Sequence, residues 1–285
     1  MRLRLGLLIA LSFGTAFAAL AAPPFQDMQW RLVGPFRGGR TRAIAGVPGN
    51  PAILYAAQVD GGVWKSDDAG RTWNPIFDGQ PTQSVGAIAV APSDPNVIYV
   101  GSGEGLHRPD LSVGDGIYKS TDAGRSWTHL GLRDAQQIAA IAVDPHDPNR
   151  LFVAALGHPF GPNTERGVFR STDGGATFQR VLYKDDHTGA NDLEIDPSNP
   201  NVVYAALWES LLGPTEDNNE FNGTGGGLFK STDGGNTWRQ LKNGFPADLV
   251  QVDVAIAPSR PSRLYAVAAM NAPHGYMTGD GLGFF

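Results

Sequence analysis

Four aspartates recur in one short pattern and are the first candidates for chemistry. The pattern reads Ser-x-Asp-x-Gly-x-(Thr/Ser)-aromatic. Carboxylates in such a pattern could bind calcium or act as acids and bases. They could equally build a hairpin turn, because Asp and Ser side chains bond nearby backbone groups and Gly tolerates positive φ. The structural role is the better explanation. It predicts four turns, which we call Asp-turns, formed by Ser66, Asp68, Gly70, Trp73; Ser120, Asp122, Gly124, Trp127; Ser171, Asp173, Gly175, Phe178; and Ser231, Asp233, Gly235, Trp238.

Other catalytic chemistries find little support. The absence of cysteine excludes disulfides, thiolate zinc sites and catalytic thiols. The six histidines are scattered without the spacing of metal ligands, and no glycine-rich stretch joins a strand to a helix as a phosphate loop does. We therefore expect no metal and no cofactor.

A long polar loop, residues 103–110, separates the second and third strands of its repeat, and its counterparts in the next repeats are residues 157–161 and 208–221. Loops on one rim of a rigid scaffold are where binding residues concentrate, so we expect a protein or carbohydrate ligand there. Trp208 lies outside the Asp-turns and is expected to stack on a sugar ring or a peptide side chain. The alternative is a local lid over the repeat. The candidate binding residues are Glu104, His107, Arg108, Asp110, His158, Trp208 and Glu209.

The elements that must position these residues follow a repeat. The Asp-turns start 54, 51 and 60 residues apart, which indicates a repeat architecture. Each repeat contains an apolar run, a turn rich in Pro, Asp and Asn, a second aromatic-bearing strand, a variable loop, a third strand and the Asp-turn before a fourth strand. Four short antiparallel strands per repeat predict an all-β fold, a β-propeller. The expected blades are residues 43–77, 86–130, 138–182, 190–241 and an incomplete 252–285.

The chain ends bear on how this propeller closes. No fifth Asp-turn follows the last repeat. Either residues 28–33, which include Trp30, supply a fourth strand to the last blade and close five blades, or the chain is part of a larger propeller with further blades. The second alternative is favoured. The expected propeller domain is residues 28–285.

Composition suggests an exported chain. Residues 1–21 combine Arg2 and Arg4, an apolar run and small residues near Ala21, as a cleaved secretory signal does. This predicts a periplasmic or extracellular protein without a membrane span in its mature chain. The formal net charge of -6 and the lack of a basic block argue against nucleic acid as a partner.

The four turns are identified as Asp-box (BNR) repeats. From Trp30 to Val267 the chain resembles the propellers of sialidases, xyloglucanases, sortilin-type receptors and a photosystem II assembly factor family. It is most similar to secreted bacterial proteins with a sortilin-like N-terminal propeller that are often called glycosyl hydrolases. In these families the Asp-box lies at the blade periphery, away from the active site, so it indicates fold more than function.

The resemblance also implies specific candidates. Sialidases use an arginine triad, and Arg37, Arg40 and Arg42 lie near the first strand, but the Ile-Pro that follows an Arg in that family is Gly-Gly here. Xyloglucanases carry a catalytic Asp in a Thr-Asp-Val-Gly-Gly stretch, and Asp60 in Val-Asp-Gly-Gly occupies a similar position. Asp60 would be the general base of an inverting hydrolase, although this family takes its acid from a second propeller. Asp115 holds the equivalent place in the next repeat, which favours a turn residue instead.

The sequence therefore favours an exported propeller that binds a protein or glycan ligand through its rim loops. The alternative is a glycoside hydrolase with Asp60 as base. A nonfunctional truncated product is a third alternative.

Overall fold

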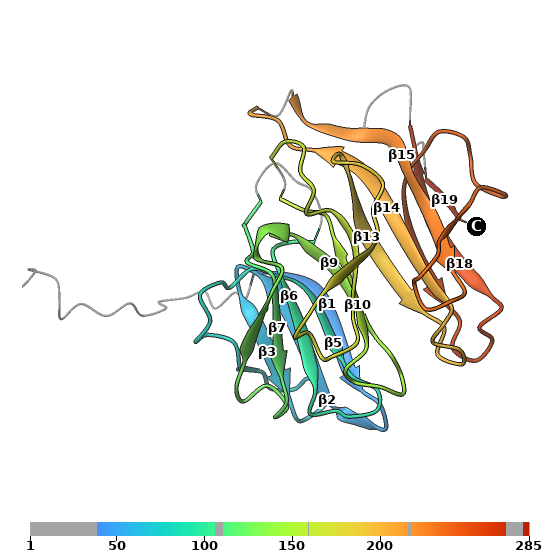
Figure 1. The fold of residues 1–285 in the computed structure, drawn as a ribbon. Coiled ribbons are helices and arrows are strands. Elements are labelled where there is room, and N and C mark those ends of the chain that lie inside the picture. Colours follow the sequence, from blue (N-terminus) through green and yellow to red (C-terminus); the bar gives the residue numbers. More distant parts are fainter. Residues whose placement is uncertain (1–38, 106–110, 159, 216–217, 272–281, 285) are drawn as a thin grey trace, which may run out of the picture. The chain divides into compact units, whose positions relative to one another are not determined.

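The computed structural model describes residues 39–105, 111–158, 160–215, 218–271 and 282–284. They belong to one compact unit, Arg37–Phe285. In the described residues the chain forms four four-stranded sheets and one three-stranded sheet, each in sequence order (Figure 1). All pairings within the sheets are antiparallel. The prediction of an all-β propeller is confirmed.

We number the sheets as blades 1–5, and the strands have the following bounds. Blade 1 contains β1 (Arg40–Val47), β2 (Asn50–Val59), β3 (Gly62–Ser66) and β4 (Asn74–Pro75). Blade 2 contains β5 (Val85–Val90), β6 (Ile98–Ser102), β7 (Ile117–Ser120) and β8 (Thr128–Gly131). Blade 3 contains β9 (Ile138–Val143), β10 (Leu151–Ala155), β11 (Gly167–Ser171) and β12 (Gln179–Leu182). Blade 4 contains β13 (Thr188–Ile195), β14 (Val203–Leu211), β15 (Glu220–Ser231) and β16 (Arg239–Leu241). Blade 5 contains β17 (Leu249–Ile256), β18 (Leu264–Met270) and β19 (Leu282–Phe284).

The first strand of each blade is its inner strand. β1, β5, β9, β13 and β17 contact one another in this order, so each blade packs against the next. Apolar clusters fill the four interfaces. Ile98 and Phe77 lie between blades 1 and 2, Leu151 between blades 2 and 3, and Phe152 between blades 3 and 4. Each of these side chains is fully buried, and burying a side chain of this size contributes about 1.5–3 kcal/mol.

The Asp-turns have the predicted hydrogen bonds, as the turn of blade 3 illustrates. The Ser171 hydroxyl accepts from the backbone N–H groups of Asp173 (3.3 Å) and Gly175 (2.8 Å) and donates to the Asp173 carboxylate (2.8 Å). The Asp173 carboxylate accepts from the Thr177 backbone N–H (2.9 Å) and hydroxyl (2.6 Å). Gly175 has a φ of 92°. All four turns repeat this network, which explains why Ser, Asp and Gly recur at these positions.

The aromatic residues that end the turns differ in environment. Trp127 packs edge-on against Phe77 at a centroid distance of 5.2 Å and donates to the Ile76 carbonyl of blade 1 (2.8 Å). Phe178 and Trp238 likewise pack against the preceding blade. Trp73 does not follow the prediction of an apolar interface, because it is 36% exposed and, in the described residues, no sheet precedes blade 1. It donates only to its own turn, at the Gly70 carbonyl (3.0 Å).

Each inner strand contains a β-bulge at the equivalent place. The ladder skips one residue between the inner and second strand in all five blades. A bulge turns two successive side chains to one side of a sheet. The extra residues are Arg42, Gly86, Ala139, Asn191 and Val250. The bulge therefore gives each blade one additional side-chain position near the neighbouring blade.

Candidate functional site

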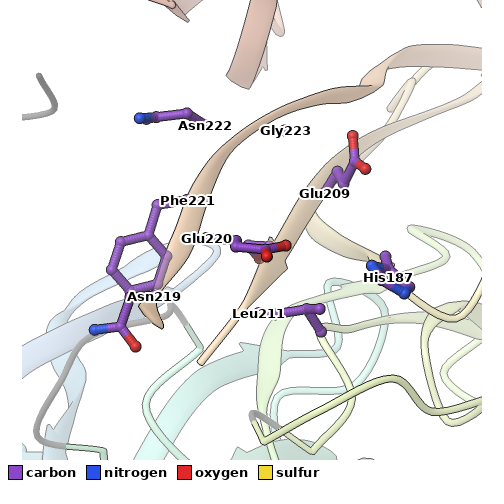
Figure 2. A pocket seen from close by; sticks show the side chains of 9 residues that line it. His187, Glu209, Leu211, Asn219, Glu220, Phe221, Asn222 and Gly223 are labelled. Carbon is purple, nitrogen blue, oxygen red and sulfur yellow. The ribbon is translucent and has the colours of Figure 1, made fainter. Parts of the chain in front are cut away.

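The extended hairpin of β14 and β15 forms a pocket of about 320 Å³ at the rim of blade 4. The polar groups come from β14, from β15 and from the segment that precedes β13, as Figure 2 shows for Glu209, Glu220 and His187. The lining consists of His187, Glu209, Ser210, Leu211, Asn219, Glu220, Phe221, Asn222 and Gly223. Carboxylates, amides and an aromatic ring provide hydrogen bonds and an apolar surface, which is the chemistry that binds a polyhydroxylated ligand.

Glycines shape this pocket by letting β15 pass close to Glu209. Glu209 pairs with Gly223 across the ladder, and its carboxylate accepts the Gly225 N–H (2.6 Å). A Cβ added at Gly223 would lie 2.5 Å from the Glu209 Cγ, and one at Gly226 would lie 2.1 Å from the Leu207 carbonyl oxygen. Larger residues there would push the strand outward. The glycines therefore hold the Glu209 carboxylate in place.

Arg166 forms hydrogen bonds to the backbone of two segments that line the pocket. The sequence had not indicated a role for this residue. Its Nη1 donates to the carbonyls of Ser210 (3.0 Å) and His187 (3.3 Å), both lining residues. Its Nη2 reaches the carbonyls of His158 (3.4 Å) and Gly161 (3.5 Å). The side chain is fully buried, and this burial lowers the pKa of Arg166 to about 10. A charged residue directly before the apolar third strand was the signal that could have identified it.

The structure corrects two predicted binding residues. Trp208 is only 2% exposed, so its ring is not available to stack on a ligand. Its Nε1 donates to the Phe221 carbonyl (3.0 Å), because residues 208–211 continue β14 instead of forming a loop. Glu104 is also buried and forms an ion pair with Arg40 (2.7 Å). It links blades 1 and 2 and is not a rim residue open to a ligand.

The other predicted binding residues separate into three groups. Glu209 lines the pocket. His158 lies on the blade 3 loop that Arg166 joins to the pocket, and its Nδ1 lies 3.1 Å from the Phe160 carbonyl. His107, Arg108 and Asp110 fall outside the described residues. Of the four candidates among the described residues, the structure places one, Glu209, in the pocket wall.

Asp60 lies in the turn between β2 and β3. It is exposed and has a φ of 57°, a conformation that is uncommon for a residue other than glycine. Asp115 is different, because its carboxylate accepts the Tyr118 hydroxyl (2.8 Å) and contacts Arg133 (3.3 Å). The equivalence that the sequence suggested for the two aspartates does not extend to their environments.

The inner strands carry three acidic residues that the sequence analysis did not single out. Burial raises the pKa of Asp192 to about 6 and, together with the charge of Asp192, raises that of Glu194 to about 7. Burial also raises the pKa of Asp253, although solvent reaches one side of this residue. Asp192 accepts the Val254 N–H (2.8 Å), and Asn191 donates to Asp253 (3.1 Å). Acidic residues inside apolar strands were the signal that could have found them.

The arginines considered for a sialidase-like triad serve the interface of blades 1 and 2. Arg42 donates to the carbonyls of Glu104 and Gly105, both at 3.1 Å, and Arg40 pairs with Glu104. Arg37 falls outside the described residues. In the part of the chain that the structure describes, no cluster of three or more His, Asp or Glu side chains could hold a metal ion. No helix among the described residues is long and apolar enough to span a membrane.

Known proteins match most of this chain. The sequence profile described as "Sortilin, neurotensin receptor 3" (Sortilin-Vps10) matches residues 115–260, about half of the 285 residues. A xyloglucanase of Paenibacillus sp. is 27% identical over 81% of this chain and 24% of its own length. The xyloglucanase Xgh74A of Acetivibrio thermocellus is 28% identical over 66% of this chain and 24% of its own. The chain thus spans about a quarter of the length of these curated relatives.

Solved structures show the same likeness. An ancestral GH74 enzyme is 25% identical, with a TM-score of 0.62 over 86% of this chain and 29% of that chain. The GH74 xyloglucanase from Xanthomonas campestris shares the fold, with a TM-score of 0.58 and 17% identity over 90% of this chain and 46% of that chain. The described blades form a glycoside hydrolase-like propeller.

Proposed function

Because the chain belongs to the Sortilin-Vps10 family and its relatives include xyloglucanases, we propose that it binds glycans through the pocket at the β14–β15 hairpin. The observation that carries the proposal is the lining of this pocket. Glu209, Glu220, Asn219 and Asn222 supply acceptors and donors, and Phe221 supplies an aromatic ring. Sugar hydroxyls donate to carboxylates, while the C–H faces of a sugar pack on apolar rings.

The pocket is built to keep its shape without a ligand. Arg166 fixes the His187 and Ser210 carbonyls, and Gly225 fixes the Glu209 carboxylate. A preformed site loses less conformational entropy on binding. The ligand proposed for a first test is a neutral xyloglucan oligosaccharide, chosen from the names of the relatives.

Titration calorimetry with this oligosaccharide tests the proposal. We expect saturable binding, and we expect Glu220→Gln to weaken it about tenfold, because a hydrogen bond to a charged group contributes ~1.5–3 kcal/mol. Glu165→Gln is the matched control, since Glu165 does not line the pocket. Absence of binding, or an equal loss in both variants, would contradict the proposal.

Hydrolysis is a second candidate function, favoured by the xyloglucanases among the relatives and by the exposed carboxylate of Asp60 between β2 and β3. The positive φ of Asp60 is the conformation that an Asp-Gly hairpin turn requires. An inverting reaction requires a second carboxylic acid, placed to protonate the leaving group. Asp60 would then activate water as the general base.

Release of reducing ends from xyloglucan by the protein and by Asp60→Asn distinguishes the two functions. A hydrolase would lose at least a hundredfold in rate in this variant, since general-base catalysis contributes about 10²–10⁴-fold. Asp78→Asn, an exposed carboxylate change in the same blade, serves as the control. Binding without any release of reducing ends would leave the binding module as the function.

We also propose that the protein is exported, on the basis of the arginines, the apolar run and the small residues of positions 1–21. Sequencing the N-terminus of the protein recovered outside the cytoplasm of a bacterial host is the test. Recovery only from the cytoplasm would contradict it.

A further inference from the structure

A second pocket is lined by a later part of β15 than the first, residues 224–226. Its volume is about 520 Å³, and it lies among the end of β16, the segment that leads to β17 and the segment before β13. Its lining includes Lys184, Gly225, Gly226, Lys242, Phe245 and Pro246. It is distinct from the first pocket, with which it shares no lining residue.

The two pockets differ in charge. The first is lined by Glu209 and Glu220 and by no lysine or arginine. The second is lined by Lys184 and Lys242 and by no aspartate or glutamate. Both lysines are exposed, so their ammonium groups can turn toward an anion without a large desolvation cost. The second pocket therefore favours a negatively charged group, and the first disfavours one.

The segment Gly223–Gly227 joins the pockets. Gly223 lines the first pocket, and Gly225 and Gly226 line the second. A Cβ added at Gly225 would lie 2.5 Å from the Glu209 Oε2 and 3.2 Å from the Lys184 Nζ. Both opposite charges therefore approach the same glycine, one from each pocket. A ligand that extends from one pocket to the other would cross this segment, in which Thr224 is the one residue that is not glycine.

We propose that the two pockets form one extended site for an acidic glycan, in which a neutral sugar occupies the first pocket and a carboxylate-bearing sugar occupies the second. This inference rests on the proposed glycan binding at the first pocket. Lys184 and Lys242 bind the carboxylate, and Phe245 and Pro246 pack against the ring that carries it. The glutamates of the first pocket repel the carboxylate and so fix the direction of the chain.

The experiment compares two ligands that differ in charge alone. Calorimetry measures the affinity of a neutral xyloglucan oligosaccharide and of the same oligosaccharide with its terminal primary alcohols oxidised to carboxylates. We expect the oxidised ligand to bind about five- to tenfold more tightly at low salt, because exposed ion pairs contribute ~0.2–1 kcal/mol each. The preference should shrink at 0.5 M salt, since screening shortens the range of exposed charges.

The double variant Lys184→Gln/Lys242→Gln should lose this preference while it keeps the affinity for the neutral ligand. Arg260→Gln, which removes an exposed positive charge that lines neither pocket, is the control and should retain the preference. Equal affinities for both ligands in the unaltered protein, or a preference that survives in the double variant, would overturn the inference.

A third probe separates the inference from the proposed function. If the neutral oligosaccharide does not bind at all, the proposed function fails, and a galacturonic acid oligomer then tests the basic pocket alone. Binding of this oligomer that is lost in the lysine double variant and kept in Arg260→Gln would support the basic pocket. No binding, or binding that does not depend on the lysines, would overturn it.

Discussion

The carboxylates of the Asp-turns and those of the inner strands differ in what surrounds them. Asp173 is open to solvent, yet the hydroxyl and N–H of Thr177 and the Ser171 hydroxyl lower its pKa to about 2. Asp192 also accepts two backbone N–H groups, but burial outweighs them and raises its pKa to about 6. The comparison shows that hydrogen-bond donors decide the direction of the pKa shift when the carboxylate is open to water, whereas desolvation decides it when the carboxylate is buried.

The consequence for stability has opposite signs in the two regions. A turn aspartate with a lowered pKa stabilises the fold above its usual value of 3.8, and this contribution disappears as the pH falls toward 2. For an inner-strand acid with a raised pKa, the free energy of unfolding falls as the pH rises from the usual pKa to the folded pKa, because only the unfolded chain releases the proton in this range. The two regions together predict greatest stability in mildly acidic solution.

The largest expected effect comes from the glycine that shapes a turn. In Gly235→Ala the new Cβ would lie 2.7 Å from a ring carbon of the buried Phe152, and the φ of 86° would strain alanine. We expect a loss of about 3 kcal/mol in the free energy of unfolding, measured with urea.

Gly70→Ala is the matched variant. It has a similar φ of 85°, but its nearest neighbours lie at 3.7 Å, so it should cost only about 1–2 kcal/mol. Equal losses in both variants would show that backbone strain alone, and not contact with the preceding blade, determines the effect.

An intermediate effect is expected for Glu194→Gln. The folded pKa of about 7 lies above the usual 4.5, so between these values the folded protein keeps a proton that the unfolded chain releases. Removing the acid should therefore raise the free energy of unfolding at pH 8 by about 1 kcal/mol, after allowance for solvent screening, and should not change it at pH 4.5. Urea unfolding at the two pH values provides the measurement, with Glu165→Gln as control. A gain of equal size at both pH values would rule out ionisation as its cause.

The smallest effect is expected in the turn itself. Thr177→Val removes the hydroxyl that contributes most to the lowered pKa of Asp173. The pKa of Asp173 should rise from about 2 toward its usual 3.8, which NMR titration of the carboxylate can follow. The free energy of unfolding of the variant should then decrease less as the pH falls, because the folded and unfolded pKa values of Asp173 lie closer together. An unchanged pKa would assign the shift to the backbone N–H groups and the Ser171 hydroxyl.

The sequence predicted the repeating parts of the fold better than the site. The Asp-turn pattern encodes local hydrogen bonds, so Ser171, Asp173 and Gly175 could be interpreted from spacing alone. Trp208 was predicted as exposed because the residues after it were expected to form a loop. The β14–β15 ladder instead continues to Leu211, and Phe221 and the core cover the ring. Glu104 was misjudged for a similar reason, since its partner Arg40 is 64 residues away.

The pocket and the inner-strand acids depend on contacts between repeats, which spacing within one repeat does not show. Glu220 was included only as part of a long loop, and Arg166 was not considered. Arg166 gains its role from carbonyls of two blades. Asp192 and Asp253 come together only because β13 and β17 are neighbours. The acids interrupt apolar strands, and that irregularity was visible in the sequence.

The repeated bulge of the inner strands has a practical consequence for engineering. Since each ladder already accommodates one unpaired residue, a substitution at these five places leaves the hydrogen-bonded register of the ladder unchanged. At present they read Arg, Gly, Ala, Asn and Val. A combinatorial library restricted to them would vary the packing between blades, because Ala139, Asn191 and Val250 are buried and Arg42 bonds the next blade. Gly86 would tolerate the least variation, because a Cβ there would lie 2.3 Å from the Ile138 carbonyl oxygen.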